Sequence, residues 1–238
     1  MIHVESRPNR FKNVGRPANV FAPKSARIAR KLLIKPERSY NQRELSQITG
    51  LDEGHTSRIV RRLEKPNLLV RDDQGALRPS DPDQLLDSRL EASDFSKHYF
   101  IKVHIAARSG EELLQGITDI LAEHQIDYAA TGLAGAWQYT HFAKFRMVSL
   151  YLADPPRRNL FDRLHFREDS RGANAWLVVP IDTGVFHGSS ARDGIACVHP
   201  VQIFLDLKGH TERAKEAASM VRQEYLKWGQ NVLKTFIS

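Results

Sequence analysis

The first third of the chain carries apolar residues at every third or fourth position, the spacing at which side chains share one face of an α-helix. A first helix is expected over residues 26–34, with Ser25 as its N-cap. A second begins after Asn41, where Glu44 stands at the position that completes a capping box. A third begins after Asp52, the next expected cap. The side chains expected to meet in a common core are Ile28, Leu32, Leu33, Leu45, Ile48, Leu51, Thr56, Ile59, Val60 and Leu63.

A glycine and a short hairpin complete this region. Gly50 separates the second and third helices, and glycine readily takes the positive φ that ends a helix. Residues 68–70 and 76–79 are β-prone and flank the turn sequence Asp-Asp-Gln-Gly at 72–75. Three helices followed by a hairpin are the order of a winged helix-turn-helix, in which the third helix enters the major groove of DNA.

After Tyr99 the pattern changes to strands that alternate with helices. Alternating or continuous apolar runs predict strands over 99–106, 128–131, 147–152 and 176–181. Helical spacing predicts a helix capped by Ser109, and others over 133–142, over 155–164 and from 214 onward, while 183–194 is expected to be a loop. The predicted fold class is therefore α+β, a winged helix-turn-helix followed by an α/β domain.

Breaks in these patterns predict four segments. Residues 1–23 are polar, basic and rich in proline, which indicates a flexible basic arm that either follows DNA phosphates or has no specific role. Residues 24–80 form the DNA-binding domain, 81–96 a linker helix, and 97–238 an α/β domain for partner contact or dimerisation.

The charge is divided unevenly between these segments. Residues 1–80 hold 17 Lys and Arg against 8 Asp and Glu, whereas residues 81–238 hold 18 against 20. Residues 1–80 thus carry an excess of +9 and the rest of the chain −2, so the positive charge lies with the predicted helix-turn-helix, which favours double-stranded DNA as the partner. A basic membrane-binding helix would need bulky apolar residues on its other face, and none is evident. A single cysteine, Cys197, and the lack of a signal peptide or long apolar run favour a cytoplasmic protein without membrane contact.

The third predicted helix carries the candidate DNA contacts. His55, Ser57 and Arg58 lie near its start, where side chains of such a helix reach base edges. The residues expected to hold phosphates are Arg43, Arg61, Arg62, Arg71 and Arg78. The alternative is an ordinary helical hairpin with a solvated basic face.

Three segments of the C-terminal part resemble a known family. They are TGLAGAWQYTHF at 131–142, VSLYLAD at 148–154 and HPVQIFLDLKGHTERAKEAASMVRQEYL at 199–226. They resemble the AbiEi-type antitoxins, transcriptional regulators of type IV toxin–antitoxin systems. This resemblance implies a repressor of its own operon and a cognate toxin as partner.

The C-terminal part also looks like a degraded nucleotidyltransferase fold. Active members carry a Gly-Ser turn, two carboxylates at positions i and i+2 of one strand to hold Mg²⁺, and a third on a later strand. Here Gly132 stands at the turn, but Ser149 and Tyr151 stand at the carboxylate positions. Asp182 or Asp206 could serve as the third carboxylate, and one cannot replace three. No enzymatic activity, metal or cofactor is therefore expected.

Other functions remain as alternatives. One is a nucleotide-binding or nucleotidyltransferase-like enzyme with an attached DNA-binding module, and another is an element-maintenance factor that is no antitoxin. His187 near Ser189 and Ser190 is expected to be a surface loop, because no nucleophile elbow supports a hydrolase. Cys197 is expected to be a buried, inert thiol. The second basic run, expected as a solvated helix face, comprises Arg157, Arg158, Arg163, Arg167 and Arg171.

Overall fold

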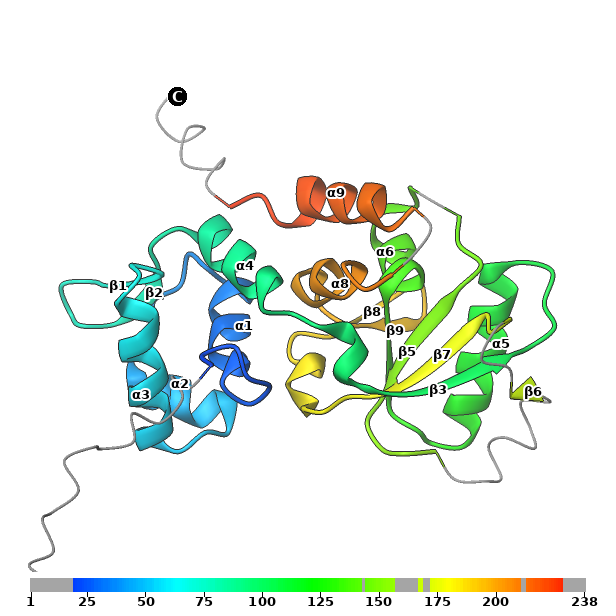
Figure 1. Ribbon diagram of the computed structural model, residues 1–238, viewed down its shortest axis with the longest axis horizontal. Coiled ribbons are helices and arrows are strands. Elements are labelled where there is room, and N and C mark those ends of the chain that lie inside the picture. The colour runs from blue at the N-terminus through cyan, green and yellow to red at the C-terminus, as the bar shows by residue number, and fades with distance from the viewer. Residues whose placement is uncertain (1–18, 143, 157–166, 169–171, 211–212, 229–238) are drawn as a thin grey trace, which may run out of the picture.

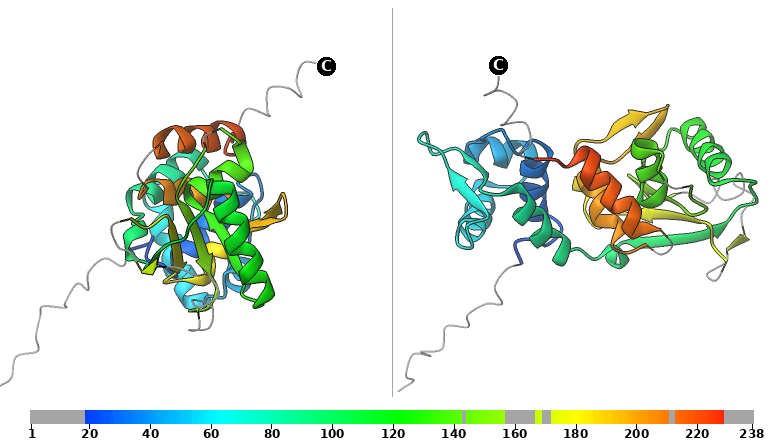
Figure 2. Two further views of the ribbon diagram at one scale, coloured as in Figure 1. Left: turned by 90° about the vertical axis from the view of Figure 1, so that its right-hand side faces the viewer. Right: turned by 90° about the horizontal axis from the view of Figure 1, so that it is seen from above.

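The computed structural model of the 238-residue chain describes residues 19–142, 144–156, 167–168, 172–210 and 213–228. It is a mixed α+β structure with a two-stranded and a seven-stranded sheet. Figure 1 places three short helices and the small hairpin at one end of the molecule and the large sheet with its helices at the other. The right-hand view in Figure 2, from above, shows the same elongated arrangement, and the left-hand view looks along the long axis. The predicted arm falls on residues that, except for 19–23, lie outside those described.

The second and third N-terminal helices begin at the caps predicted for them. Asn41 Oδ1 accepts from the Glu44 amide at 2.7 Å, and Asp52 Oδ1 accepts from the His55 amide at 2.7 Å. Gly50 ends the second helix with φ of 66°, as expected. These elements are α1 (Ala26–Ile34), α2 (Gln42–Thr49), α3 (Glu53–Glu64), β1 (Leu69–Arg71) and β2 (Leu77–Pro79).

Three local predictions here were wrong. Ser25 has helical backbone angles and does not cap α1; its hydroxyl lies 3.1 Å from Nε2 of His55 instead. The Glu44 carboxylate pairs with Arg38, so it does not close the capping box as predicted. Ile48 is 37% exposed, because the buried face of α2 runs through Leu45, Ser46 and Thr49.

A buried tyrosine holds the hairpin against the helices. Tyr40 is fully buried, and its backbone exchanges two hydrogen bonds with Leu77 of β2, at 2.9 and 2.7 Å. The apolar positions of α1 and α3 pack around it, as the helical spacing predicted. The three helices and the hairpin therefore share one core.

The large sheet has the order β6-β3-β7-β5-β4-β9-β8. Its central strand β5 runs antiparallel to β4 and parallel to β7, and β3 runs antiparallel to β7. The strands are β3 (Tyr99–His104), β4 (Tyr128–Thr131), β5 (Val148–Leu152), β6 (Arg167–Glu168), β7 (Ala175–Val179), β8 (Ser190–Arg192) and β9 (Ile195–Cys197). The four strands predicted from periodicity are thus present, with ends shifted by one to two residues in three of them.

The helices of this part pack on the sheet and on one another. Ser109 caps α5 through the Glu112 amide, as predicted. Helix α6 contacts β4 and β5, and α8 and α9 both pack against α6. The bounds are α5 (Gly110–Glu123), α6 (Gly132–Thr140), α8 (Pro200–Leu207) and α9 (Ala214–Tyr225). The helix expected over 155–164 lies mostly outside the described residues.

The segment expected to be a loop contains regular structure. Residues Thr183–Phe186 form a 3-10 helix (η2), and β8 pairs with β9 in a tight hairpin. Asp193 and Gly194 have φ of 47° and 80°, which is the pair of positive values of a two-residue hairpin turn. The Asp-Gly dipeptide could have indicated this hairpin turn. The strand was missed because Ser190–Arg192 is exposed and has no alternation of apolar and polar residues.

Helix α4 (Pro82–Glu91) and the short 3-10 helix η1 (Phe95–Lys97) connect the two ends of the molecule. Helix α4 packs against both α1 and α8. Arg27 of α1 also bridges directly to Asp182, with its Nη2 at 2.7 Å from Oδ2 and its Nε at 2.8 Å from Oδ1. The two ends are therefore joined by packing and by charge.

Candidate nucleic-acid interface

Helix α3 presents the most open set of cationic side chains predicted for DNA contact. Its apolar side, with Ile59, Val60 and Leu63, is buried, which turns Arg58 and Arg61 outward into solvent. Asp52 caps the helix, and the hydrogen bond from the His55 amide lowers the pKa of its carboxyl. Asp52 therefore stays ionised at neutral pH and fixes the start of α3.

Several of the other predicted contact residues already have partners within the protein. The His55 ring lies against Ser25, and Ser57 is half-buried. Arg71 donates to Glu64 Oε1 at 2.7 Å and to the Gly75 carbonyl at 3.0 Å, which ties the hairpin to the last turn of α3.

The remaining predicted phosphate contacts lie around α3. Arg43 is 78% exposed on α2 and lies 3.9 Å from Glu53 at the start of α3. Arg78 is exposed on β2, whereas Arg62 is half-buried and engaged in an interaction of its own. The predicted residues thus surround one helix, and Arg43, Arg58, Arg61 and Arg78 among them are exposed to solvent.

The positions of the suspected nucleotidyltransferase site are filled by side chains. Ser149 and Tyr151 lie on β5 and are completely buried. A Cβ added at Gly132, which has φ of 57°, would lie 2.4 Å from Cε1 of His210. The His210 ring lies 5.2 Å from the ring of Trp176 in a tilted arrangement, and Trp176 pairs with Ser149 across the sheet. The His210 ring therefore occupies the space above Gly132.

The two candidate carboxylates have structural partners. Asp182 precedes η2 and binds Arg27, and it accepts from the Gly184 amide at 2.9 Å. Asp206 lies on α8, where Thr131 donates to it at 2.6 Å and Gln202 at 2.7 Å. Burial raises the pKa of Asp206 to about 6. Neither lies on a strand, and no three potential ligands of a metal ion cluster within the described ranges.

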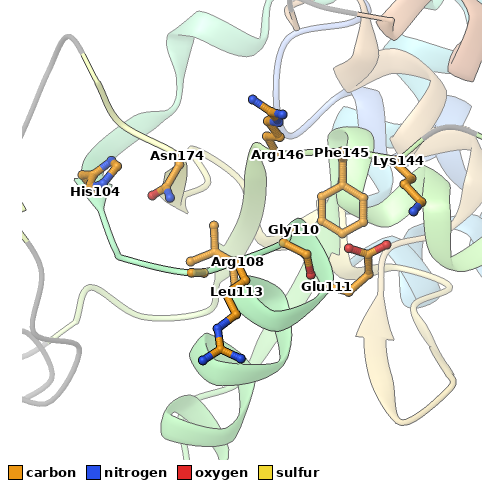
Figure 3. A pocket seen from close by; sticks show the side chains of 11 residues that line it. His104, Arg108, Gly110, Glu111, Leu113, Lys144, Phe145, Arg146 and Asn174 are labelled. Atoms are coloured by element: carbon orange, nitrogen blue, oxygen red, sulfur yellow. The ribbon is translucent and has the colours of Figure 1, made fainter.

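A pocket that the sequence did not suggest lies at the start of α5. It has a volume of about 640 Å³ and includes Arg108, Lys144 and Arg146 in its lining. Figure 3 shows the charged ends of Arg108 and Arg146 pointing away from each other, while the Glu111 carboxylate points toward Phe145. The basic groups do not converge on one point, so this pocket has no built anion site.

The last residues singled out from the sequence are Cys197 and the arginines of the second basic run. Cys197 is buried, as predicted, and burial raises the pKa of its thiol to about 12, which disfavours the reactive thiolate. Arg167 belongs to β6. The other arginines of the second basic run, which are Arg157, Arg158, Arg163 and Arg171, lie outside the described residues.

Comparisons with known proteins identify the family. Within the described ranges, no helix has the length and apolar character needed to span a bilayer. Neither the curated proteins nor the solved structures compared with the chain include a match. The family model of the AbiEi antitoxin, a transcriptional regulator of type IV toxin–antitoxin systems, matches residues 85–227, which run from α4 to the residues just after α9. The chain therefore belongs to the AbiEi family of transcriptional regulators of type IV toxin–antitoxin systems.

Proposed function

We propose that this regulator binds a specific DNA operator through α1–β2, acting as a winged helix-turn-helix with α3 in the major groove. The observation that carries the proposal is the outward face of α3, where Arg58 and Arg61 are exposed beside a hairpin tied to the same helix. This face lies in the part of the chain that holds its excess of positive charge. Such a face meets the two requirements of major-groove binding, which are cationic side chains and a helix anchored from behind.

The geometry refines the expected roles. Arg58 lies near the start of α3 and is exposed, so it is our main candidate for a bidentate contact to guanine. Arg43, Arg61 and Arg78 flank it and would hold phosphates. His55 and Arg71 would first have to leave Ser25 and Glu64, so their contribution should be smaller.

We further propose that the α/β part binds a partner and does not transfer nucleotides. In support, Ser149 and Tyr151 are neutral and completely buried, and His210 fills the space over Gly132. Carboxylates and a place for the triphosphate would both be needed for two-metal chemistry. The family supports a cognate toxin as the partner. We propose in addition that the operator belongs to the chain's own operon, which the protein represses in the cytoplasm. Homodimerisation through this part would match a palindromic operator.

The DNA-binding proposal is tested with the full chain and the DNA upstream of its own gene. Arg58→Ala should weaken binding to that DNA by about 5- to 150-fold, which corresponds to the 1–3 kcal/mol of one bidentate base contact, and should change random DNA less. Arg108→Ala serves as the matched control, because Arg108 is exposed on the other end of the molecule. Equal loss in both variants, or no preference for upstream over random DNA, would refute the proposal.

The enzyme alternative has its own assay. Purified protein is incubated with labelled nucleoside triphosphates, Mg²⁺ or Mn²⁺, and tRNA or protein acceptors. We expect no label transfer. Transfer that disappears in Asp206→Asn would establish a nucleotidyltransferase and overturn the binding-only role.

A further inference from the structure

A small cavity lies where α1, α4 and α8 meet the segments after α4 and before η2. Its volume is about 90 Å³, and its wall includes Arg30 of α1 and Arg89 of α4. The exposed fractions of these two arginines are only 3% and 7%. Exposed residues at the rim, Lys97 and Ile181, leave the cavity accessible from solvent. Two charged side chains are thus buried around one small space.

These arginines have unused hydrogen-bond donors. Arg30 donates through Nε to Gln202 Oε1 at 2.9 Å, but its Nη1 is buried and has no partner among the described residues. The buried Nε of Arg89 likewise has none there. Arginine almost never loses its proton in proteins, and an unpaired buried charge is strongly unfavourable. Burial lowers the pKa of both side chains, and for Arg89 to about 10, so Arg89 stays charged at neutral pH.

The acidic residues in the cavity wall are engaged elsewhere. Asp182 is bound by Arg27 through both oxygens. Asp94 caps η1 and lies 3.5 Å from the Nζ of Lys97 at the surface.

The third acid, Asp206, is occupied by neutral donors. Its two oxygens accept from Thr131 and from Gln202. Gln202 therefore stands between Arg30 and this carboxylate and prevents a direct ion pair. Asp182 and Asp206 attract Arg30 through space, and Asp206 attracts Arg89, but no described acidic residue accepts a hydrogen bond from the free Nη1 of Arg30 or the free Nε of Arg89.

The size of the cavity limits what could supply the missing charge. A single water needs roughly 10–15 Å³ of such space, so 90 Å³ accommodates several waters or one small oxyanion. Planar guanidinium groups match the oxygens of phosphate, which can accept from several donors at once. A whole nucleotide would not fit, although its terminal phosphoryl group could enter while the rest stays outside.

We propose that this cavity binds a phosphate group, held between Arg30 and Arg89. The group is either inorganic phosphate or the terminal phosphoryl group of a nucleotide. An anion at this point would connect α1, α4 and α8, and α1 also holds α3 through the contact between Ser25 and His55. A phosphate bound here could therefore change the orientation of α3, and this effect on DNA binding rests on the proposed function. The phosphate site itself does not depend on DNA binding.

The test is thermal unfolding of the full chain in a phosphate-free buffer, with potassium phosphate, ADP or ATP added at constant ionic strength. A ligand at 100 times its Kd should raise the melting temperature by about 5–10 °C in a saturable way. Saturation by inorganic phosphate identifies the free ion, and saturation by nucleotides alone identifies a phosphoryl group. No rise in melting temperature with any of the three ligands refutes the site. A rise that does not saturate refutes it too, because phosphate stabilises proteins generally without binding to a site.

Variants separate the site from general salt effects. Arg89→Met keeps the side-chain volume but removes the charge, so it should abolish the saturable shift while raising the melting temperature in the absence of phosphate. Ala92→Leu keeps both arginines, enlarges a side chain of the cavity wall and should also lose the shift, which covers the case that Arg89→Met does not fold. Arg108→Met, in the open pocket of Figure 3, should keep it. A full shift in Ala92→Leu or Arg89→Met would overturn the proposal.

Discussion

The arginines of α3 and those at the junction of α1 and α4 are chemically identical and structurally opposite. Arg58 and Arg61 are exposed to solvent, whereas Arg30 and Arg89 are 3% and 7% exposed. The first pair keeps its hydration until DNA arrives, and the second has lost its hydration within the folded chain. Net charge therefore overstates the basic surface of the N-terminal part, because Arg27 and Arg30 are counted in it but face the rest of the protein.

Buried and exposed ion pairs differ in the same way, and breaking a buried pair should have the largest effect on the free energy of unfolding. Asp182 is only 6% exposed in its pair with Arg27, so Arg27→Ala leaves a buried carboxylate without its cation. Loss of one partner of a buried pair costs roughly 3–5 kcal/mol. Arg43→Ala is the matched control, since Arg43 and Glu53 form an exposed pair and such pairs contribute about 0–1 kcal/mol. Urea unfolding of both variants measures the difference, and equal losses would show that the junction pair contributes no more than a surface pair.

This pair also marks the limit of what sequence can predict. The caps at Asn41, Asp52 and Ser109 were predictable, because each involves residues only three positions apart. Arg27 and Asp182 are 155 positions apart, and nothing local distinguishes an arginine that will be buried from one that will meet DNA.

The candidate site was predictable to a similar degree. Helical spacing identified the outward face of α3, since the position of Arg58 relative to Ile59 and Leu63 decides which way it points. It could not show that Ser25 would engage His55, because that contact depends on how α1 crosses α3. The same reasoning explains Asp206, whose helix and neighbours depend on the packing of α8 against β4.

Acid should destabilise the protein through three histidines that burial keeps neutral. Burial lowers the pKa of His98, His199 and His210 to about 4, so each binds a proton more readily when unfolded. Their contribution is present above the unfolded pKa of about 6.5 and is lost as pH falls toward 4. Asp206 opposes them, because its raised pKa of about 6 favours the folded state as pH falls through 6 toward its unfolded value.

Three histidines outweigh one carboxyl, so the free energy of unfolding should fall by roughly 2–4 kcal/mol between pH 7 and pH 5. Denaturant unfolding in phosphate-free buffer at both values measures this. His210→Phe should reduce the loss, because it removes one titrating group from an aromatic cluster. Asp206→Asn should enlarge the loss, and stability that rises toward pH 5 would contradict the assignment.

The exposed arginines should differ among themselves in what they contribute to DNA binding. Arg61 is expected to contact phosphate only, so Arg61→Ala should weaken binding to upstream and random DNA alike, by about 1 kcal/mol. Removing one phosphate contact lowers the slope of log K against log salt by roughly 0.9. Titrations at several salt concentrations, compared with Arg58→Ala, separate the two roles. A loss of sequence preference in Arg61→Ala, with an unchanged slope, would reverse them.

The smallest effect is expected deep in the sheet, at Ser149. Its hydroxyl is completely buried and has no hydrogen-bond partner in the described part of the chain. Ser149→Ala removes this unsatisfied group and leaves little empty space, so stability should stay equal or rise by about 1 kcal/mol. Thr131→Val is the matched control, because the Thr131 hydroxyl donates to Asp206 at 2.6 Å and its loss should cost roughly 1–3 kcal/mol. If Ser149→Ala instead lost as much stability as Thr131→Val, the Ser149 hydroxyl would have to be bound by a partner such as an ordered water. A bound water would then lie at the strand position of the suspected nucleotide site, near the rings of Trp176 and His210. The interior of the sheet would in that case contain a polar site and would no longer contrast with the exposed basic face of α3.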